Sequence, residues 1–160
     1  MIDDDVYDAA ARLLDICRGR RLTVATVESC TGGLVAASLT AVAGSSDVVD
    51  RGFVTYTNEA KTELVGVPAN LFPRVGAVSE EVARAMAEGG LRFSKADICV
   101  GITGVAGPGQ SESKPAGLVH IAAARRGGKT LHERCMFPGD RGAVRKASVL
   151  RAFDLILGLA

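Results

Sequence analysis

Apolar positions recur along the chain with two spacings, one typical of helices and the other typical of strands. From Val6 to Cys17 they follow helical spacing, which predicts an amphipathic helix over 5–18. Short runs of apolar, largely β-branched residues predict buried strands over 22–27 and 97–102. We expect further helices over 34–39, 58–66, 79–93 and 141–159, a strand over 52–56 that is a candidate for the sheet edge, and a hairpin of strands over 117–124 and 129–137.

Local signals refine some of these elements. Asn58 and Ser79 are good N-cap residues for the helices that follow them, and Phe93 is expected on the buried side of the second of these helices. The segment 68–76 contains two prolines and is expected to be irregular. Helices that alternate with apolar strands, followed by one late hairpin, predict an α/β fold. We expect a three-layer α/β/α sandwich on a mixed, mostly parallel sheet, as one domain over 1–160.

Composition narrows the cellular context. The chain has 160 residues, of which 48% are hydrophobic, enough for one domain with a substantial core. No uncharged apolar run approaches the ~20 residues that span a bilayer, so no membrane association is expected. The N-terminus is acidic, whereas a secretory signal begins with basic residues. These features favour a cytoplasmic protein.

Charge and cysteine content exclude two further classes. The formal net charge is +1 and only 4% of residues are aromatic, which argues against a nucleic-acid surface. The four cysteines are scattered, without a CxxC pair or a Cys/His cluster, so no zinc site is expected. Cys30 alone adjoins a candidate site, where a helix N-terminus could lower its pKa, but no histidine partner for it is evident.

The stretch from Glu28 to Gly33 is the first candidate for a site. It follows the strand over 22–27 and precedes a helix, which places side chains and free N–H groups at the carboxyl edge of the sheet. Glu28, Ser29 and Thr31 are therefore candidate ligand-binding or catalytic residues. The alternative is structural: Ser29 or Thr31 caps the helix, and Gly32 and Gly33 make the turn.

A glycine-rich run over 101–109 is the second candidate. It lacks the Gly-Lys-Ser/Thr of a P-loop and opens no helix, so neither phosphate-binding fingerprint applies. Loops of this composition often wrap a polar ligand with backbone donors, which favours binding over a mere connection.

Three further groups could take part in catalysis or binding. Lys61 lies in the first turn of its predicted helix, where the helix dipole and partial burial would lower its pKa and make it a usable base beside Tyr56. The alternative is an exposed pair. Ser46, in a Gly-Ser-Ser loop, is either a nucleophile reached through space or a cap. Arg141 and Arg145 lie one turn apart and could pair with a phosphate or, alternatively, with Asp140 and solvent.

Taken together, these residues resemble the CinA C-terminal domain family, the competence/damage-inducible protein A group. The resemblance extends over nearly the whole chain. The segments that carry it are Ala25–Gly33, Ala43–Ser46, Arg51–Lys61, Gly76–Ser79 and Gly104–Pro108. It implies a CinA-like α/β/α fold, usually assembled as a homodimer, in a stand-alone form without the additional N-terminal domain of many members.

The implied activity is hydrolysis of the carboxamide of nicotinamide mononucleotide (NMN) to nicotinate mononucleotide and ammonia, in pyridine-nucleotide recycling. Such hydrolysis needs a nucleophile, a base and an oxyanion stabiliser. Without a metal or a cofactor, a hydroxyl–lysine mechanism is expected, with Lys61 as base, Tyr56 as proton relay, and either Ser29 or Ser46 as nucleophile. The polar run 110–114 has no assigned role.

The expected binding roles complete this interpretation. Thr31, Gly32 and Gly33 stabilise the oxyanion or hold the phosphate, while Thr103, Gly104 and Gly107 line the ribose-phosphate side. Two other classes stay open. One is a sensor that binds a pyridine nucleotide without turning it over, and the other is a structural partner in DNA uptake, which the neutral charge does not support.

Overall fold

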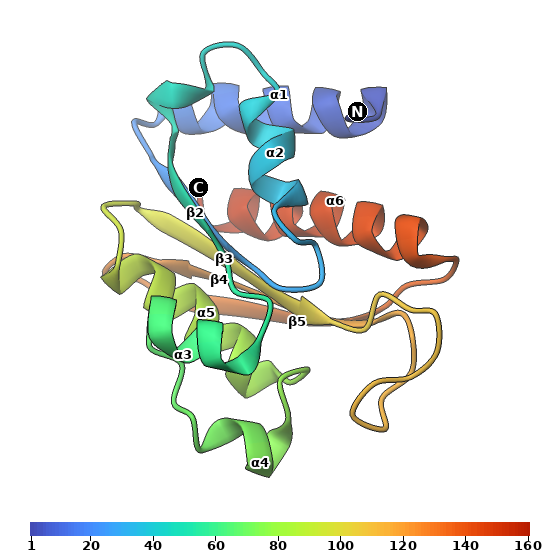
Figure 1. Cartoon of the computed structure of the whole chain (residues 1–160). Helices are drawn as coiled ribbons and strands as arrows, with labels where there is room; N and C mark the ends of the chain where they lie inside the picture. The colour runs from blue at the N-terminus through green and yellow to red at the C-terminus, as the bar shows by residue number, and fades with distance from the viewer.

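Five strands form one mixed sheet with helices on both faces (Figure 1). The computed structural model describes all 160 residues. The strand order is β2-β1-β3-β4-β5, in which β1 pairs in parallel with β2 and β3, whereas β4 is antiparallel to both of its neighbours. Four strands therefore point one way and only β4 runs against them, which confirms the α/β sandwich on a mixed, mostly parallel sheet.

The elements follow one another with short connections. In chain order they are α1 (Asp4–Gly19), β1 (Val24–Glu28), α2 (Leu34–Thr40), the 3₁₀ turn η1 (Ser45–Asp47), β2 (Val49–Val54), α3 (Asn58–Val65), α4 (Leu71–Val75), α5 (Glu80–Arg92), β3 (Ile98–Gly104), β4 (Leu118–Arg125), β5 (Thr130–Met136) and α6 (Arg141–Leu159). None of the helices combines the length and the hydrophobicity needed to cross a bilayer.

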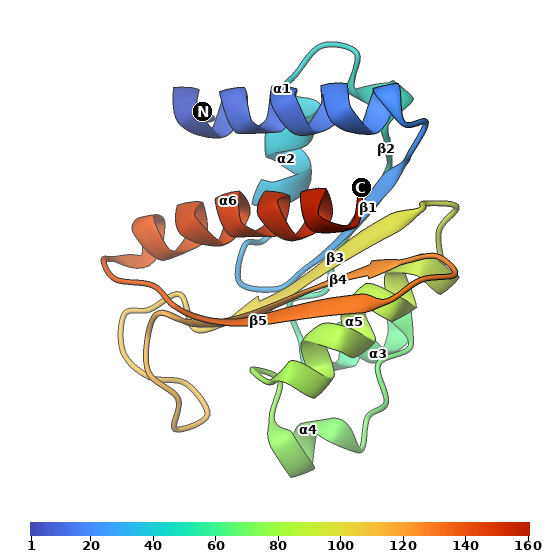
Figure 2. The same ribbon diagram turned by 180° about the vertical axis from the view of Figure 1, so that it is seen from behind.

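The two faces of the sheet bury separate hydrophobic cores. Helices α1, α2 and α6 lie on one side of the sheet and α3 and α5 on the other, where α4 packs against α5 farther from the strands (Figures 1 and 2). Because successive strand side chains point to opposite faces, Ile98 and Val100 of β3 join the first core, of 26 buried residues, while Cys99 joins the second, of 13. The strands are thus apolar throughout, as expected for a sheet covered on both sides.

Glycines bring the second layer close to the sheet. A Cβ on Gly101 of β3 would lie 2.8 Å from the carbonyl oxygen of Ala83 in α5. A Cβ on Gly89 of α5 would lie 2.0 Å from the carbonyl oxygen of Val65 at the end of α3. These two positions hold α3, α5 and the sheet at backbone contact distance, and α3 carries Lys61.

The carboxyl ends of the parallel strands meet at one edge of the sheet. In the ladder, Glu28 at the end of β1 lies opposite Val54 of β2 and Ile102 of β3. The residues that follow these strands are therefore neighbours, although they come from three separate parts of the chain. In open α/β sheets this is the edge where ligands bind.

Three local predictions are corrected by the structure. The N-cap of α3 is Thr57, whose Oγ1 accepts a hydrogen bond from the N–H of Ala60 at 3.0 Å, and Asn58 is the first helical residue. The segment 68–76 contains the short helix α4, which tolerates Pro73 because N–H groups in a first turn need no helical partner. Phe93 is 49% exposed, since it lies beyond the last helical residue of α5.

Two other local predictions are confirmed. Ser79 caps α5, with its Oγ accepting from the N–H of Val82 at 3.3 Å. The strand expected near 52–56 is β2, and it lies at the edge of the sheet.

We predict that Gly89→Ala destabilises the protein by about 3 kcal/mol, because the added methyl group overlaps the backbone of Val65 and α3 must move. Urea unfolding at equilibrium measures this free energy. Gly19→Ala is the matched control, since nothing lies within 4 Å of a Cβ there. We expect the control within about 0.5 kcal/mol of the unmodified protein. Equal stability of the two variants would contradict the close packing of α3 on α5.

Candidate active site

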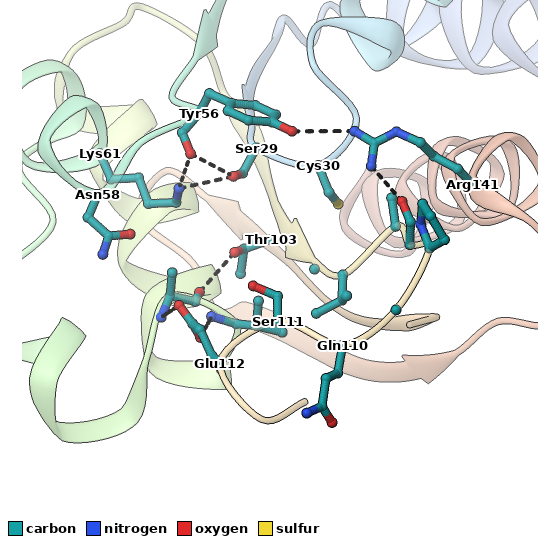
Figure 3. Close-up of a pocket in the computed structure, with 18 residues that line it drawn as sticks. Ser29, Cys30, Tyr56, Asn58, Lys61, Thr103, Gln110, Ser111, Glu112 and Arg141 are labelled. Atoms are coloured by element: carbon teal, nitrogen blue, oxygen red, sulfur yellow. Dashed lines mark hydrogen bonds between the residues drawn. The ribbon is translucent and has the colours of Figure 1, made fainter. Parts of the chain in front are cut away.

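A pocket of about 300 Å³ opens at the carboxyl edge of the sheet (Figure 3). Its walls come from the turn after β1, the junction between β2 and α3, the segment before α5, the end of β3 with the loop that follows it, and the first residue of α6. The side chains that line it include Ser29, Cys30, Tyr56, Lys61, Thr103 and Arg141.

The buried amine of Lys61 is the centre of this pocket. Its Nζ donates to Ser29 Oγ at 3.0 Å and to the carbonyl oxygens of Thr55, Tyr56 and Thr57 at 2.9, 3.2 and 3.5 Å. Helical side chains lean toward the helix N-terminus, so a lysine in the first turn of α3 reaches back to the carbonyls that lead into it. No carboxylate lies within ion-pair distance of this nitrogen.

Burial lowers the pKa of Lys61 to about 8. Nearby negative charge would oppose this shift, and the contributors are Cys30, Glu112 and Glu59. The Cys30 thiol is neutral near pH 8, because its own burial raises its pKa to about 12, so the carboxylates alone oppose the shift. A lysine with this pKa exchanges a proton near neutral pH and can accept one from the hydroxyl beside it.

Ser29 is placed by the end of β1. Its N–H donates to the carbonyl of Ile102 at 3.0 Å, which extends the β1–β3 ladder by one residue. Its carbonyl accepts the N–H of Gly32 at 3.0 Å, and Gly32 and Gly33 have φ values of +57° and +100°, which glycine adopts without strain. The glycines therefore make the turn, as the structural alternative expected, but neither Ser29 nor Thr31 caps α2, because its N-cap is Gly33 and no side chain accepts there. The same turn presents Ser29 to Lys61.

Glu28 faces away from the pocket. The residue is only 1% exposed, and its carboxylate accepts hydrogen bonds from the N–H groups of Val35 at 2.8 Å and Ala36 at 3.0 Å. It thus occupies the N-terminus of α2, where a negative charge is favourable. Neighbouring strand side chains point to opposite faces, so Glu28 contacts α2 while Ser29 faces the side of α3.

Arg145 and Thr31 also lie behind the pocket wall. Arg145 donates to the carbonyls of Cys30 at 3.3 Å and Thr31 at 2.9 Å, so it holds the turn from the side of α6. The hydroxyl of Thr31 is buried without a hydrogen-bond partner. Neither residue lines the pocket, nor do Gly32 and Gly33.

The structure brings Ser29, but not Ser46, to Lys61. Ser46 lies in η1, before β2 begins, whereas Tyr56 follows the end of β2. A strand of six residues spans about 20 Å, which puts Ser46 at the opposite edge of the sheet. It is not among the residues that line the pocket.

Tyr56 and Arg141 close the other end of the pocket. The guanidinium of Arg141 donates to the Tyr56 hydroxyl at 3.3 Å and to the carbonyl of Gly107 at 2.7 Å. The ring of Tyr56 points toward Arg141, so the carbonyl of this residue, and not its hydroxyl, contacts Lys61 (Figure 3). Gly104 and Gly107 line the pocket as well, and the Thr103 hydroxyl donates to the Ala77 carbonyl at 2.8 Å.

Asn58, Ser111 and Glu112 also line the pocket and were not predicted from the sequence. The sequence pattern indicates a cap at Asn58 and gives no sign of a place in the pocket. Ser111 and Glu112 belong to the polar run without an assigned role, and only the return of the loop toward the sheet brings them here. Nowhere in the structure do three or more His, Cys, Asp or Glu side chains converge in a way that could hold a metal ion.

Comparison with known proteins gives consistent matches. Residues 6–160 match the family model of the CinA C-terminal domain. The chain is 43% identical to the nicotinamide-nucleotide amidohydrolase PncC of Escherichia coli K12, over 98% of this chain and 95% of that protein. It is 52% identical to a CinA-like protein of Akkermansia muciniphila over 85% of this chain.

The relatives differ in length. The chain spans 33% of the Akkermansia protein and 36% of a CinA-like protein from Geobacter sulfurreducens. Among solved structures, the competence/damage inducible protein CihA of Agrobacterium tumefaciens superposes with a TM-score of 0.95 at 44% identity, over 99% of this chain and 98% of that one. A CinA superfamily protein of Escherichia coli gives a TM-score of 0.93 at 32% identity, over 100% of this chain and 94% of that one.

We predict that Glu28→Gln lowers the free energy of unfolding by about 2 kcal/mol, because each carboxylate oxygen accepts one N–H group of α2, whereas glutamine replaces one of these oxygens with an NH₂ donor and carries no charge. Chemical denaturation followed by circular dichroism measures the loss. Glu63→Gln removes a carboxylate from the exposed side of α3 and is the control, expected within about 0.5 kcal/mol. If Glu28→Gln is as stable as the control, the carboxylate does not hold α2.

Proposed function

This chain belongs to the CinA C-terminal domain family, and from that premise we propose that it hydrolyses the carboxamide of nicotinamide mononucleotide to nicotinate mononucleotide and ammonia. The PncC relative, which is named as a nicotinamide-nucleotide amidohydrolase, matches nearly the whole chain and supports the choice of substrate. The observation that carries the proposal is the 3.0 Å contact between Ser29 Oγ and the buried Nζ of Lys61. A hydroxyl beside an amine of lowered pKa is a nucleophile with its base.

The first half of the reaction transfers the acyl group to the enzyme. The neutral Nζ of Lys61 takes the proton of Ser29, and Oγ attacks the carboxamide carbon. As the tetrahedral intermediate collapses, the C–N bond breaks, and Lys61 returns the proton to the departing nitrogen, which leaves as ammonia. In the second half, water attacks the ester, Lys61 again accepts a proton, and Ser29 recovers it as nicotinate mononucleotide is released.

The negative oxygen of the intermediate needs donors close to Ser29. The backbone N–H of Cys30, the next residue, donates to no backbone carbonyl in the structure and is free for this role. Gly32 and Gly33 do not line the pocket, and the N–H of Gly32 already donates to the carbonyl of Ser29 at 3.0 Å. We therefore assign the oxyanion to the amide of Cys30 in preference to Gly32 and Gly33.

The other end of the pocket suits the nucleotide's phosphate. Arg141 supplies a permanent positive charge, and its guanidinium contacts Gly107 and Tyr56 while keeping further N–H donors free. Tyr56 is 60% exposed at this end of the pocket, so its hydroxyl is better placed to contact the phosphate or a water chain than to contact Lys61. In this arrangement the carboxamide lies at Ser29 and the ribose phosphate extends toward α6.

We predict that kcat/KM for ammonia release from NMN falls tenfold per pH unit below about pH 8, because only the neutral form of Lys61 is a base. Acidification protonates the amine and removes the base, so activity rises with pH through this pKa. Lys61→Met should lose ~100-fold or more. Lys129→Met, which removes an exposed lysine, should retain full activity. If ammonia release resists EDTA and depends neither on pH nor on the Lys61 substitution, Lys61 is excluded as the base.

A second prediction separates the two candidate nucleophiles. Ser29→Ala should reduce kcat by ~1,000-fold or more, because no hydroxyl then contacts Lys61, whereas Ser46→Ala should leave kcat unchanged. Mass spectrometry of the protein mixed rapidly with NMN should detect an acyl adduct on Ser29 only. Full activity of Ser29→Ala together with loss in Ser46→Ala would overturn the assignment. A protein that NMN stabilises against heat without ammonia release would be a sensor.

A further inference from the structure

The loop over 105–117, between β3 and β4, builds the pocket wall opposite Ser29 and Lys61 (Figure 3). Two side chains fasten it to the segment 75–78. The Glu112 carboxylate accepts hydrogen bonds from the N–H groups of Ala77 at 3.0 Å and Val78 at 3.2 Å. Lys114 donates to the carbonyls of Val75 at 2.9 Å and of Val78.

This attachment fixes the position of the Glu112 carboxylate. Glu112 and Ser113 have φ values of +54° and +62°, a left-handed conformation that residues other than glycine rarely adopt. The hydrogen bonds to Ala77 and Val78 hold the backbone in this conformation. The carboxylate is therefore a charge in a defined place on the pocket wall, and not the end of a mobile side chain.

Charged side chains are few in this pocket. Of the 18 residues that line it, Lys61, Glu112 and Arg141 are ionisable and charged near neutral pH, and Glu112 supplies the only carboxylate. Arg141 has a counterpart in the substrate's phosphate. Glu112 gives one wall of the pocket a negative charge, and NMN brings a positive one: the quaternary nitrogen of its pyridinium ring, which lies between the carboxamide and the ribose phosphate.

We propose that Glu112 is a specificity-determining residue, whose carboxylate selects nucleotides with a positively charged pyridinium ring over their neutral, reduced dihydropyridine forms. This inference rests on the proposed function. The field of Glu112 reaches the reacting groups, since it opposes the effect of burial on the pKa of Lys61. The same charge would repel the carboxylate that hydrolysis creates and so favour release of the product.

Lys114 limits the size of the effect. Its Nζ lies 3.6 Å from Glu112 Oε2 and neutralises part of the charge, but Lys114 itself does not line the pocket. A carboxylate at the pocket wall is also partly screened, because the side chain of Glu112 is 32% exposed. We therefore expect selection by about one order of magnitude and not by the several orders that an unscreened, buried pair would give.

The test compares NMN with reduced NMN, which has the same carboxamide, ribose and phosphate but an uncharged ring. Dissociation constants are measured by calorimetry in the Ser29→Ala background, which prevents turnover. Adding Glu112→Gln should weaken binding of NMN about tenfold and change binding of the reduced nucleotide less than about twofold. Lys114→Met is the matched control, since it removes a contact of the same loop but leaves the carboxylate, and the preference for NMN should persist or increase.

Two outcomes would overturn the inference. If Glu112→Gln weakens the binding of both nucleotides equally, the carboxylate serves only to hold the loop. If it weakens the binding of neither, the carboxylate does not interact with the pyridinium ring. Should Glu112→Gln fail to fold, the Ser29→Ala protein itself supplies the test. Its preference for NMN over the reduced form should shrink as salt rises from about 0.05 M to about 0.5 M, because ions screen the carboxylate. A preference that is independent of salt would reject the role of charge.

Ammonia release by the unmodified protein is measured in a separate experiment, which distinguishes failure of the hydrolase proposal from failure of the Glu112 proposal. Release from NMN without preference for the charged ring would leave the hydrolase proposal standing and reject the role of Glu112. Preference for the charged ring without release would reject hydrolysis and leave Glu112 as the selecting residue of a binding protein.

Discussion

The structure depends on one unfavourable placement, a lysine amine taken out of water without a carboxylate beside it. A buried ammonium without a counter-ion is costly in free energy. Carbonyl oxygens surround this one, but their dipoles compensate only in part for the hydration that the ammonium loses. Lys61 meets three such carbonyls and one hydroxyl. The neutral amine keeps two N–H donors for these carbonyls, and its lone pair can accept the proton of the Ser29 hydroxyl.

This placement explains why the neighbouring elements meet where they do. The carbonyls belong to Thr55, Tyr56 and Thr57, so β2 must end and α3 must begin within a few residues. Thr57 makes that possible, because it is both the N-cap of α3 and a carbonyl partner of Lys61. Helix α3 in turn lies at backbone contact distance from α5, at Gly89, which fixes the depth at which the lysine is buried.

Much of this could be predicted from local pattern. The strand β1, the turn and the helix that follows it can be recognised from their sequence, and so can the place of Lys61 in a first helical turn. The low pKa of Lys61 could not be predicted in this way, because its main cause is burial, which depends on how α3 packs. Strand alternation, applied to Glu28 and Ser29, would also have put the two side chains on opposite faces. The partner of Lys61 could not be found this way, because Ser29 and Ser46 are both hydroxyls in glycine-bearing loops and differ only in the strand end at which they lie. Pairing of β1 with β2 decides between them, and pairing is a long-range property.

The position of the loop that carries Glu112 could not be predicted from local sequence pattern either, but for a different reason. Its position is determined by hydrogen bonds to Ala77 and Val78, which lie more than thirty residues earlier and have no polar side chains to mark them. The negative charge of Glu112 also has two opposing effects on the site. Beside Lys61 a carboxylate would keep the amine protonated, yet a pocket for a pyridinium ring benefits from negative charge. Placing Glu112 on the opposite wall, held by backbone amides and partly neutralised by Lys114, leaves the pKa of Lys61 low while the cavity keeps a negative side.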